Sequence, residues 1–173
     1  TLTSPYYIGR YEVTQAQWQA RTGSNPSHFV PPNYSDEPTR PVEMVSWNNI
    51  VNDFQPGTGL RLPTEAEWEY ACRAGTTTAF HGYAAMPGGF DDDSLAGNIA
   101  WYDANARIMT HSVGQKAANG FGLHDMAGNV KEWCADRDDA FYYSNSPAVD
   151  PPGPSSGSDR VFRGGSWFDF SDD

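Results

Sequence analysis

The clearest hydrophobic periodicity in the chain lies between residues 64 and 75. Trp68, Ala71 and Cys72 are spaced as i, i+3 and i+4, which places them on one face of a helix. Thr64 and Glu67 form a capping box at its start, and Gly75 supplies a left-handed stop. We therefore predict a helix whose apolar face, Cys72 included, packs on the core.

The same local signals predict two shorter helices nearer the N-terminus. Thr14 and Gln17 form a second capping box, and Gly23 marks the end of that helix. Ser46 is a plausible cap for a helix that runs through residues 47–54.

The remaining segments predict strands and loops. Residues 6–13 alternate and are rich in β-forming side chains, which predicts a strand. Residues 76–98 are rich in glycine and acidic side chains, as in a surface loop, and short strands joined by long loops are expected from residue 101 onward. The pattern indicates one loop-dominated α+β domain over residues 1–173 with little regular sheet.

Composition narrows the class of protein. Hydrophobic residues make up only 38% of the chain, but aromatic residues reach 14%, and such large rings can build a core from few positions. The net charge of −11 argues against a nucleic-acid partner or an anionic membrane surface. It fits an acidic, well-solvated surface, and it also fits carboxylates that bind divalent cations.

No stretch of the sequence approaches a membrane span, and no signal peptide opens it. The location in the cell therefore stays open. An upstream signal or lipid anchor would make the domain extracellular or place it on the cell surface.

The usual nucleophiles and metal ligands are scattered. Cys72 and Cys134 lack a zinc spacing and are both expected to be buried, inert thiols. The four histidines are well separated, and the sequence contains no phosphate-binding loop and no serine nucleophile elbow. An aromatic run at residues 141–143 could stack on a sugar or peptide, although packing beneath a loop is the commoner role.

Residues 119–133 contain a candidate cation site. A carboxylate, Asp125, is surrounded by glycines and an amide, and Ca²⁺ favours a few carboxylates together with backbone carbonyls. The carbonyls around Gly128 and Val130 would complete such a site. The alternative is that Asp125 and Asn129 only bond backbone groups in a tight turn.

The last informative segment is the turn at residues 163–167. Two adjacent glycines allow a backbone path that excludes a Cβ, and Trp167 requires an apolar socket, so the turn fixes the direction of the residues after it. Aromatic anchors mixed with short polar groups come next and resemble an adaptable binding surface. This candidate ligand-binding surface consists of Trp167, Phe168, Asp169, Phe170, Ser171, Asp172 and Asp173.

Four blocks, at residues 11–15, 61–70, 122–133 and 163–167, together resemble the formylglycine-generating enzyme (sulfatase-modifying factor) family. The resemblance implies a C-type-lectin-like fold with little regular secondary structure. Enzymes of this family oxidise a sulfatase cysteine to formylglycine with O₂ and a copper ion held by two cysteines. Those cysteines come after the Arg-Gly-Gly-Ser motif, and the first expected position here is Asp169, while the second lies beyond Asp173.

A carboxylate is a poor ligand for a soft metal, so no copper is expected. The resemblance thus favours a non-catalytic domain that binds an unidentified protein or carbohydrate. The alternative is a formylglycine-generating oxidase whose second cysteine lies outside these residues, or a related enzyme with other ligands. Some relatives are variable proteins of diversity-generating retroelements, in which the residues after the Gly-Gly-Ser-Trp turn are rewritten, and this surface would be diversified in the same way.

The resemblance also implies structural calcium. It places Glu12 beside Asp125, together with the carbonyls near Met126, Gly128 and Val130. Relatives end in a Gly-Phe-Arg strand that residues 1–173 do not contain, so the domain is expected to lack its C-terminal strand here.

Overall fold

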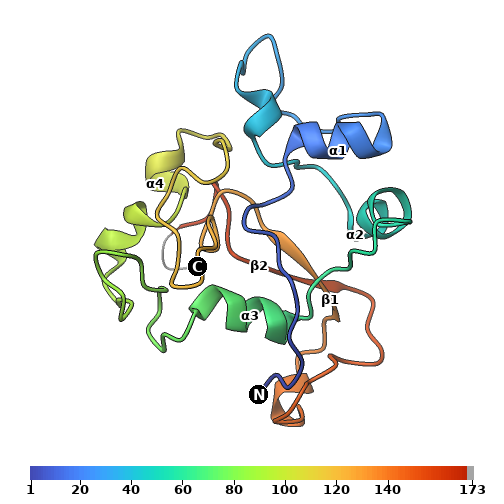
Figure 1. The fold of residues 1–173 in the computed structure, drawn as a ribbon, viewed down its shortest axis with the longest axis vertical. Helices are drawn as coiled ribbons and strands as arrows, with labels where there is room; N and C mark the ends of the chain where they lie inside the picture. The colour runs from blue at the N-terminus through green and yellow to red at the C-terminus, as the bar shows by residue number, and fades with distance from the viewer. Residues whose placement is uncertain (171–173) are drawn as a thin grey trace.

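The computed structural model describes residues 1–170, and short helices joined by long loops make up most of the chain (Figure 1). The α-helices are α1 (Gln15–Thr22), α2 (Trp47–Asn49), α3 (Glu65–Arg73) and α4 (Asp103–Ala106). A π-helical turn, η2 (Ile50–Phe54), continues α2, and 3₁₀ turns lie at η1 (Glu37–Thr39), η3 (Asp93–Asn98) and η4 (Tyr142–Ser144). The strands of the described residues are β1 (Glu132–Arg137) and β2 (Arg160–Arg163).

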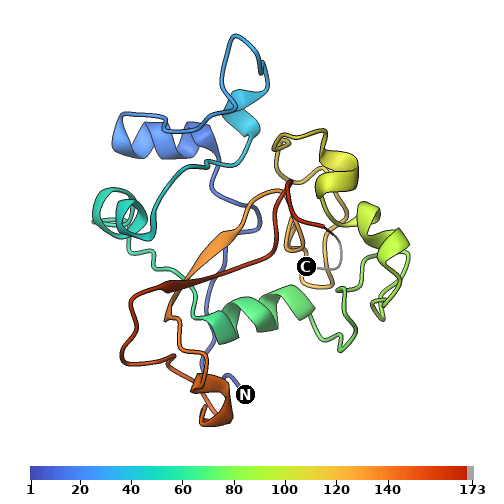
Figure 2. The same ribbon diagram turned by 180° about the vertical axis from the view of Figure 1, so that it is seen from behind.

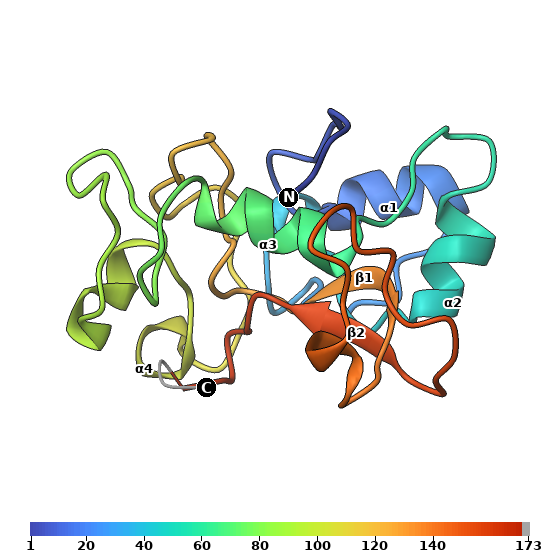
Figure 3. The ribbon, with the colours of Figure 1, turned by 90° about the horizontal axis from the view of Figure 1, so that it is seen from below.

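The two strands form an antiparallel pair at the centre of the molecule (Figures 1 and 2). Glu132 lies opposite Arg163, and Trp133 lies opposite Phe162, after which the register shifts before Arg137. Helix α3 packs against this pair, with α1 and α2 toward one end of the molecule and α4 with its loops toward the other (Figure 3). The strand pair therefore joins the two ends.

All three predicted helices form, and each begins at the predicted cap. The side chains of Thr14, Ser46 and Thr64 each accept a hydrogen bond from the backbone three residues on, completing capping boxes. Such a cap is worth about 1 kcal/mol, and it depends only on neighbouring residues. The end of α3 differs slightly from the prediction because Ala74, with φ 46°, already adopts the left-handed conformation before Gly75.

The predicted strand at residues 6–13 does not form. This segment is extended, but its backbone bonds are isolated: Arg10 accepts one from His124, and Val13 accepts one from Val42. Its side chains instead reach the rest of the fold, as when the Tyr6 hydroxyl donates to the Glu67 carbonyl at 2.6 Å. Because no strand of residues 1–170 pairs with it, this β-forming sequence is an extended segment and not a strand.

The predicted surface loop at residues 76–98 is also corrected, because part of it packs into the core. Phe80 and Phe90 form a bridge and stack with ring centroids 5.1 Å apart. Phe90, Ile99 and Ala100 are buried in one apolar cluster, whereas Trp68, Ala71, Leu123, Met126 and Cys134 form the other. This packing could not be inferred from the sequence, because the acidic residues 91–93 indicate a solvated loop although the neighbouring Phe90 is buried.

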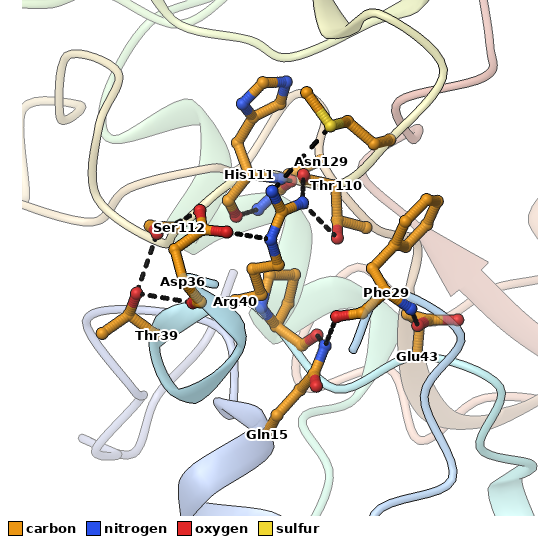
Figure 4. A network of polar contacts seen from close by, with 12 residues as sticks. Gln15, Phe29, Asp36, Thr39, Arg40, Glu43, Thr110, His111, Ser112 and Asn129 are labelled. Carbon is orange, nitrogen blue, oxygen red and sulfur yellow. Dashed lines mark hydrogen bonds and ion pairs between the residues drawn. The ribbon is translucent and has the colours of Figure 1, made fainter. Parts of the chain in front are cut away.

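A buried arginine ties the N-terminal loops to the loop that comes after α4 (Figure 4). Arg40 donates to the Asp36 carboxylate at 2.7 Å and to the Thr110 carbonyl. Beside it, the His111 backbone N–H donates to Oδ1 of Asn129 at 2.8 Å. Asn129 thereby becomes a fixed point under the turn at residues 163–167.

Candidate ligand-binding site

The turn between β2 and the last described residues takes a path that only glycine fits well. Gly164 has φ 97°, and a Cβ there would lie 3.1 Å from Cζ2 of Trp68. Gly165 has φ 68°, so both residues are in the left-handed region. The turn is therefore held against α3 with no side chain between them.

Trp167 anchors the far side of this turn. Its backbone N–H donates to the Asn129 carbonyl at 2.9 Å, and its ring meets Phe29 edge to face at 5.5 Å. The predicted apolar socket is thus partly provided by the loop that comes after α1. The backbone is fixed at this point, and the next side chains are presented from it.

The described residues after the anchor divide into exposed rings and a tethered acid. Phe168 and Phe170 are 65% and 64% exposed. The Asp169 carboxylate pairs with Lys131 Nζ at 3.0 Å and accepts a hydrogen bond from the Ser166 hydroxyl at 2.9 Å. The backbone carbonyl of Asp169 accepts from the Asp103 N–H at 3.0 Å. Ser171, Asp172 and Asp173, also assigned to this surface from the sequence, lie outside the described residues.

A pocket of about 460 Å³ lies beside the turn. Helix α3 contributes Trp68 and Cys72 to its lining. Polar groups come from Lys131, from Arg163 at the end of β2, and from Ser166 and Asp169 in and after the turn. Aromatic side chains from separate segments also line it: Phe80, Tyr102, Phe162 and Phe170. The volume lies in the range typical of small-ligand pockets.

The arginine that begins the turn is held by α3. Arg163 pairs with Glu69 and lies 3.7 Å from Oε1 of Glu65. The Tyr143 hydroxyl donates to the same Glu65 carboxylate at 2.7 Å. Tyr143 belongs to the aromatic run at residues 141–143; its ring and that of Phe141 are exposed, so this run does not pack beneath a loop.

The predicted cation-site residues come together behind the turn. Glu12 is buried; its carboxylate accepts from the Asn129 side chain at 2.8 Å and from the Val130 N–H at 3.1 Å. Asp125, 2% exposed, accepts from the Gly114 N–H at 2.6 Å through Oδ2, while Oδ1 is buried with no partner among residues 1–170. The alternative prediction, that Asp125 only bonds backbone groups, explains the position of Oδ2 but leaves Oδ1 without a partner among residues 1–170.

Burial and neighbouring carboxylates raise the pKa values of Glu12 and Glu132. Burial raises the pKa of Glu12 well above its usual range, and the neighbouring Asp125 and Glu132 raise it further. Burial also raises the pKa of Glu132, to about 7. Glu132 was missed as part of this cluster, although it stands only two residues after Val130 in the sequence.

Three backbone carbonyls, those of Met126, Gly128 and Val130, are predicted beside these acids. The Met126 carbonyl accepts from the Cys72 thiol at 3.5 Å, and a Cβ on Gly128 would lie 2.4 Å from the Trp101 carbonyl. Asp125 and Asn129 have φ of 63° and 72°, so the loop turns sharply between them. In residues 1–170 no three His, Cys, Asp or Glu side chains are arranged to hold a metal, so a cation here would depend on carbonyl oxygens.

The two cysteines, which the sequence predicts to be buried, differ in burial: Cys134 is buried, whereas Cys72 is partly buried. Cys72 lies on the inner face of α3, where burial and then Glu69 raise its pKa to about 12. Cys134 is fully buried in β1, and burial, then Asp136, raise its pKa still more. These surroundings disfavour the thiolate form of both cysteines, which is the nucleophilic form.

The scarcity of regular sheet, the capped helices and the glycine turn above a pocket define a C-type-lectin-like fold of the formylglycine-generating type. The chain belongs to the sulfatase-modifying factor enzyme 1-like domain family, whose model matches residues 1–173. None of the helices in residues 1–170 has the length and apolar character needed to cross a bilayer.

The sequence relatives include two bacterial formylglycine-generating enzymes. The protein from Streptomyces coelicolor is 36% identical over 169 residues, which cover 95% of this chain and 51% of the relative. The protein from Thermomonospora curvata is 38% identical over 172 residues, covering 95% and 54%. The chain thus spans about half the length of these relatives.

Solved structures support the same fold. Treponema denticola variable protein 1 superposes with a TM-score of 0.75 at 34% identity, over 94% of this chain and 75% of that one. PvdO from Pseudomonas aeruginosa superposes with a TM-score of 0.66 at 28% identity, over 91% and 67%. Similarity therefore extends both to proteins named as enzymes and to one named as a variable protein.

Proposed function

We propose that this chain is a non-catalytic ligand-binding domain whose binding surface comes directly after the Gly-Gly-Ser-Trp turn. The observation that carries the proposal is the environment of Asp169. By family resemblance a catalytic cysteine belongs at this position, but the carboxylate here is engaged by Lys131 and Ser166. It braces the turn instead of offering a soft ligand or a nucleophile.

The chemistry of the donors near the pocket also opposes a copper oxidase. Cu(I) favours thiolates, and Cys72, the thiol that lines the pocket, has its pKa raised to about 12 by burial and by Glu69. Cys134 is enclosed between α3 and the strand pair. Copper chemistry at this turn would need ligands other than these two thiols.

The exposed side chains support a binding role. Trp167 fixes the backbone through Asn129 and Phe29, while Phe168 and Phe170 remain about two-thirds exposed. A rigid backbone that displays rings lowers the entropy lost on binding, as in antibody paratopes. We extend the surface to Ser171, Asp172 and Asp173, and infer that its side chains are diversified, in line with the similarity to a variable protein.

We further propose that a calcium ion stabilises the scaffold behind this surface. Asp125 has a buried oxygen without a partner among residues 1–170. Burial and the nearby charge of Asp125 both raise the pKa of Glu12, so two negative charges at this place are unfavourable without a cation. A divalent cation would compensate both charges. Glu12 and Asp125 would hold it with carbonyls of Met126, Gly128 and Val130, and it would rigidify the loop that carries Asn129.

The second candidate is the family's oxidase activity, favoured by the formylglycine-generating enzymes among the relatives. The two candidates make different demands on Asp169. An enzyme requires a reactive group there or immediately after it, whereas a binding domain requires only that the turn stay rigid.

Binding can be tested with arrays of purified proteins and defined glycans, because the ligand is expected to be one or the other. The double variant Phe168→Ser/Phe170→Ser is expected to lose the wild-type signal. Tyr7→Ser removes a fully exposed aromatic ring outside the proposed surface and serves as the control. Retention of binding in the double variant would contradict a ligand site after the turn.

A further inference from the structure

The lining of the pocket beside the turn contains two buried polar atoms with no partner among residues 1–170, the acceptor Nε2 of His81 and the donor Nε of Arg163. The charges of the lining are already paired: Lys131 pairs with Asp169, and the terminal guanidinium nitrogens of Arg163 pair with Glu69 and Glu65. The Ser166 hydroxyl donates to Asp169. A strongly charged ligand would have to displace these pairs, so the pocket favours a neutral one.

The unmatched acceptor belongs to His81, which lines the pocket and is 4% exposed. Its Nδ1 lies 3.0 Å from the Gly82 carbonyl, and since a carbonyl only accepts, we assign the proton to Nδ1. Burial lowers the pKa of His81, so the ring is neutral. Nε2 is therefore a lone-pair acceptor, and it is buried without a partner among residues 1–170.

The rest of the lining indicates what kind of group would donate to it. Phe80, Tyr102 and Phe162 contribute aromatic surface from three segments. A flat ring can pack among them, and aromatic pairs add stabilisation beyond the area they bury. A sugar would bring many hydroxyls to a pocket whose charged groups are already engaged, and a phenylalanine would leave His81 unmatched.

We propose that this pocket binds a tyrosine side chain of a protein ligand, with the ring among the aromatic residues and the phenolic hydroxyl donating to Nε2 of His81. The inference rests on the proposed binding function and names the ligand chemistry of its central pocket. A phenol stays protonated at neutral pH, since its ordinary pKa is about 10, and remains a donor there. The volume of about 460 Å³ has room for the ring and the adjoining peptide group.

The test compares N-acetyltyrosinamide with N-acetylphenylalaninamide, which differ by the hydroxyl alone, in NMR titrations of the whole chain. We expect the tyrosine compound to bind roughly five-fold more tightly, the effect of one net hydrogen bond. His81→Phe is expected to abolish this preference while leaving the affinity for the phenylalanine compound within about two-fold. Equal affinities in the wild type, or a preference that survives in His81→Phe, would overturn the assignment.

A second variant keeps the proposal falsifiable if His81→Phe fails to fold. Ala79 lines the pocket but is exposed, so Ala79→Trp should fill the pocket without disturbing the core. It is expected to abolish binding of both compounds, whereas Ala140→Trp, at an exposed position outside the lining, should leave binding unchanged. Binding that persists in Ala79→Trp would place the ligand elsewhere.

The outcome is separable from that of the proposed function. A chain that binds its array ligand through Phe168 and Phe170 but does not distinguish the two amides would refute only the tyrosine pocket. A chain that oxidised a peptide cysteine would refute the non-catalytic role, whichever amide it preferred.

Discussion

Nζ of Lys131 lies 3.0 Å from Oδ1 of Asp169, joining the residue that precedes β1 to the segment after the Gly-Gly-Ser-Trp turn. The two side chains are 41% and 21% exposed, so solvent weakens the pair without removing it. The contact makes Asp169 a structural brace at the position where the family resemblance places a catalytic cysteine.

Breaking this pair should weaken the fold slightly. Lys131→Met is expected to lower the free energy of unfolding by less than about 1 kcal/mol, as for other partly exposed ion pairs. Asp169→Asn should have a similar effect, and the double variant should cost less than the sum of the two. Urea denaturation of the four proteins measures this coupling; strict additivity would show that the two charges do not interact.

Gly164 should be less tolerant of substitution than a left-handed glycine whose added Cβ would meet open space. Gly164→Ala combines a φ of 97° with a Cβ 3.1 Å from the Trp68 ring, so we expect a loss of about 1–3 kcal/mol. Gly122→Ala is the matched control, because Gly122 has φ 80° and no atom within 4 Å of the added Cβ. Equal losses in thermal or urea unfolding would mean that contact with α3 contributes nothing to the turn.

Calcium should stabilise the chain through the site behind the turn. A ligand that binds only the native state at about one hundred times its Kd adds about 2.7 kcal/mol, so Tm should rise with calcium and fall in excess chelator. Asp125→Asn should remove this dependence. Asp93→Asn, at an exposed acid in η3, should retain it. A Tm that is the same in calcium and in chelator would argue against the site.

Much of the local structure could be predicted from the sequence. The capping boxes at Thr14, Ser46 and Thr64 involve residues three positions apart, so the helices that they start were foreseeable. The extended segment at residues 6–13 was misread as a strand because alternation does not reveal whether a partner strand exists. The burial of Phe90 was hidden by the acidic residues that come directly after it.

The candidate site was predictable only in part, for a similar reason. Glu12 and Val130 are 118 residues apart, and only the family resemblance linked this glutamate to the later loop. Asp169 stood at a recognisable place after the turn, but its pairing with Lys131 depends on the tertiary fold. The pocket acceptor on His81 was invisible, because an isolated histidine in a glycine-rich segment carries no pattern.

Acid should destabilise the chain in part through His111. Burial lowers the pKa of His111, and the nearby Arg40 and Lys116 lower it further, against the opposing effects of the Ala106 carbonyl and Asp36. A histidine whose pKa is lower in the folded than in the unfolded state contributes stability above its unfolded pKa and loses it as the pH falls through the folded value.

The ring of His111 stacks on Trp101 with centroids 3.7 Å apart, so His111→Phe preserves the stack without the titration. We expect the drop in unfolding free energy between about pH 7.5 and about pH 5.5 to be smaller in this variant than in the wild type. Urea denaturation at both pH values measures the difference. An identical drop in the two proteins would exclude His111 as a source of acid sensitivity.

The most direct test of the central claim is mass spectrometry of a cysteine-containing sulfatase peptide incubated with this chain, copper and O₂. The account predicts that the peptide cysteine remains unchanged, because Asp169 is a salt-bridged carboxylate and the pKa of the pocket thiol, Cys72, is raised to about 12. A formylglycine-generating enzyme assayed in parallel verifies the conditions. Conversion of the cysteine to formylglycine by this chain would contradict the proposed binding function.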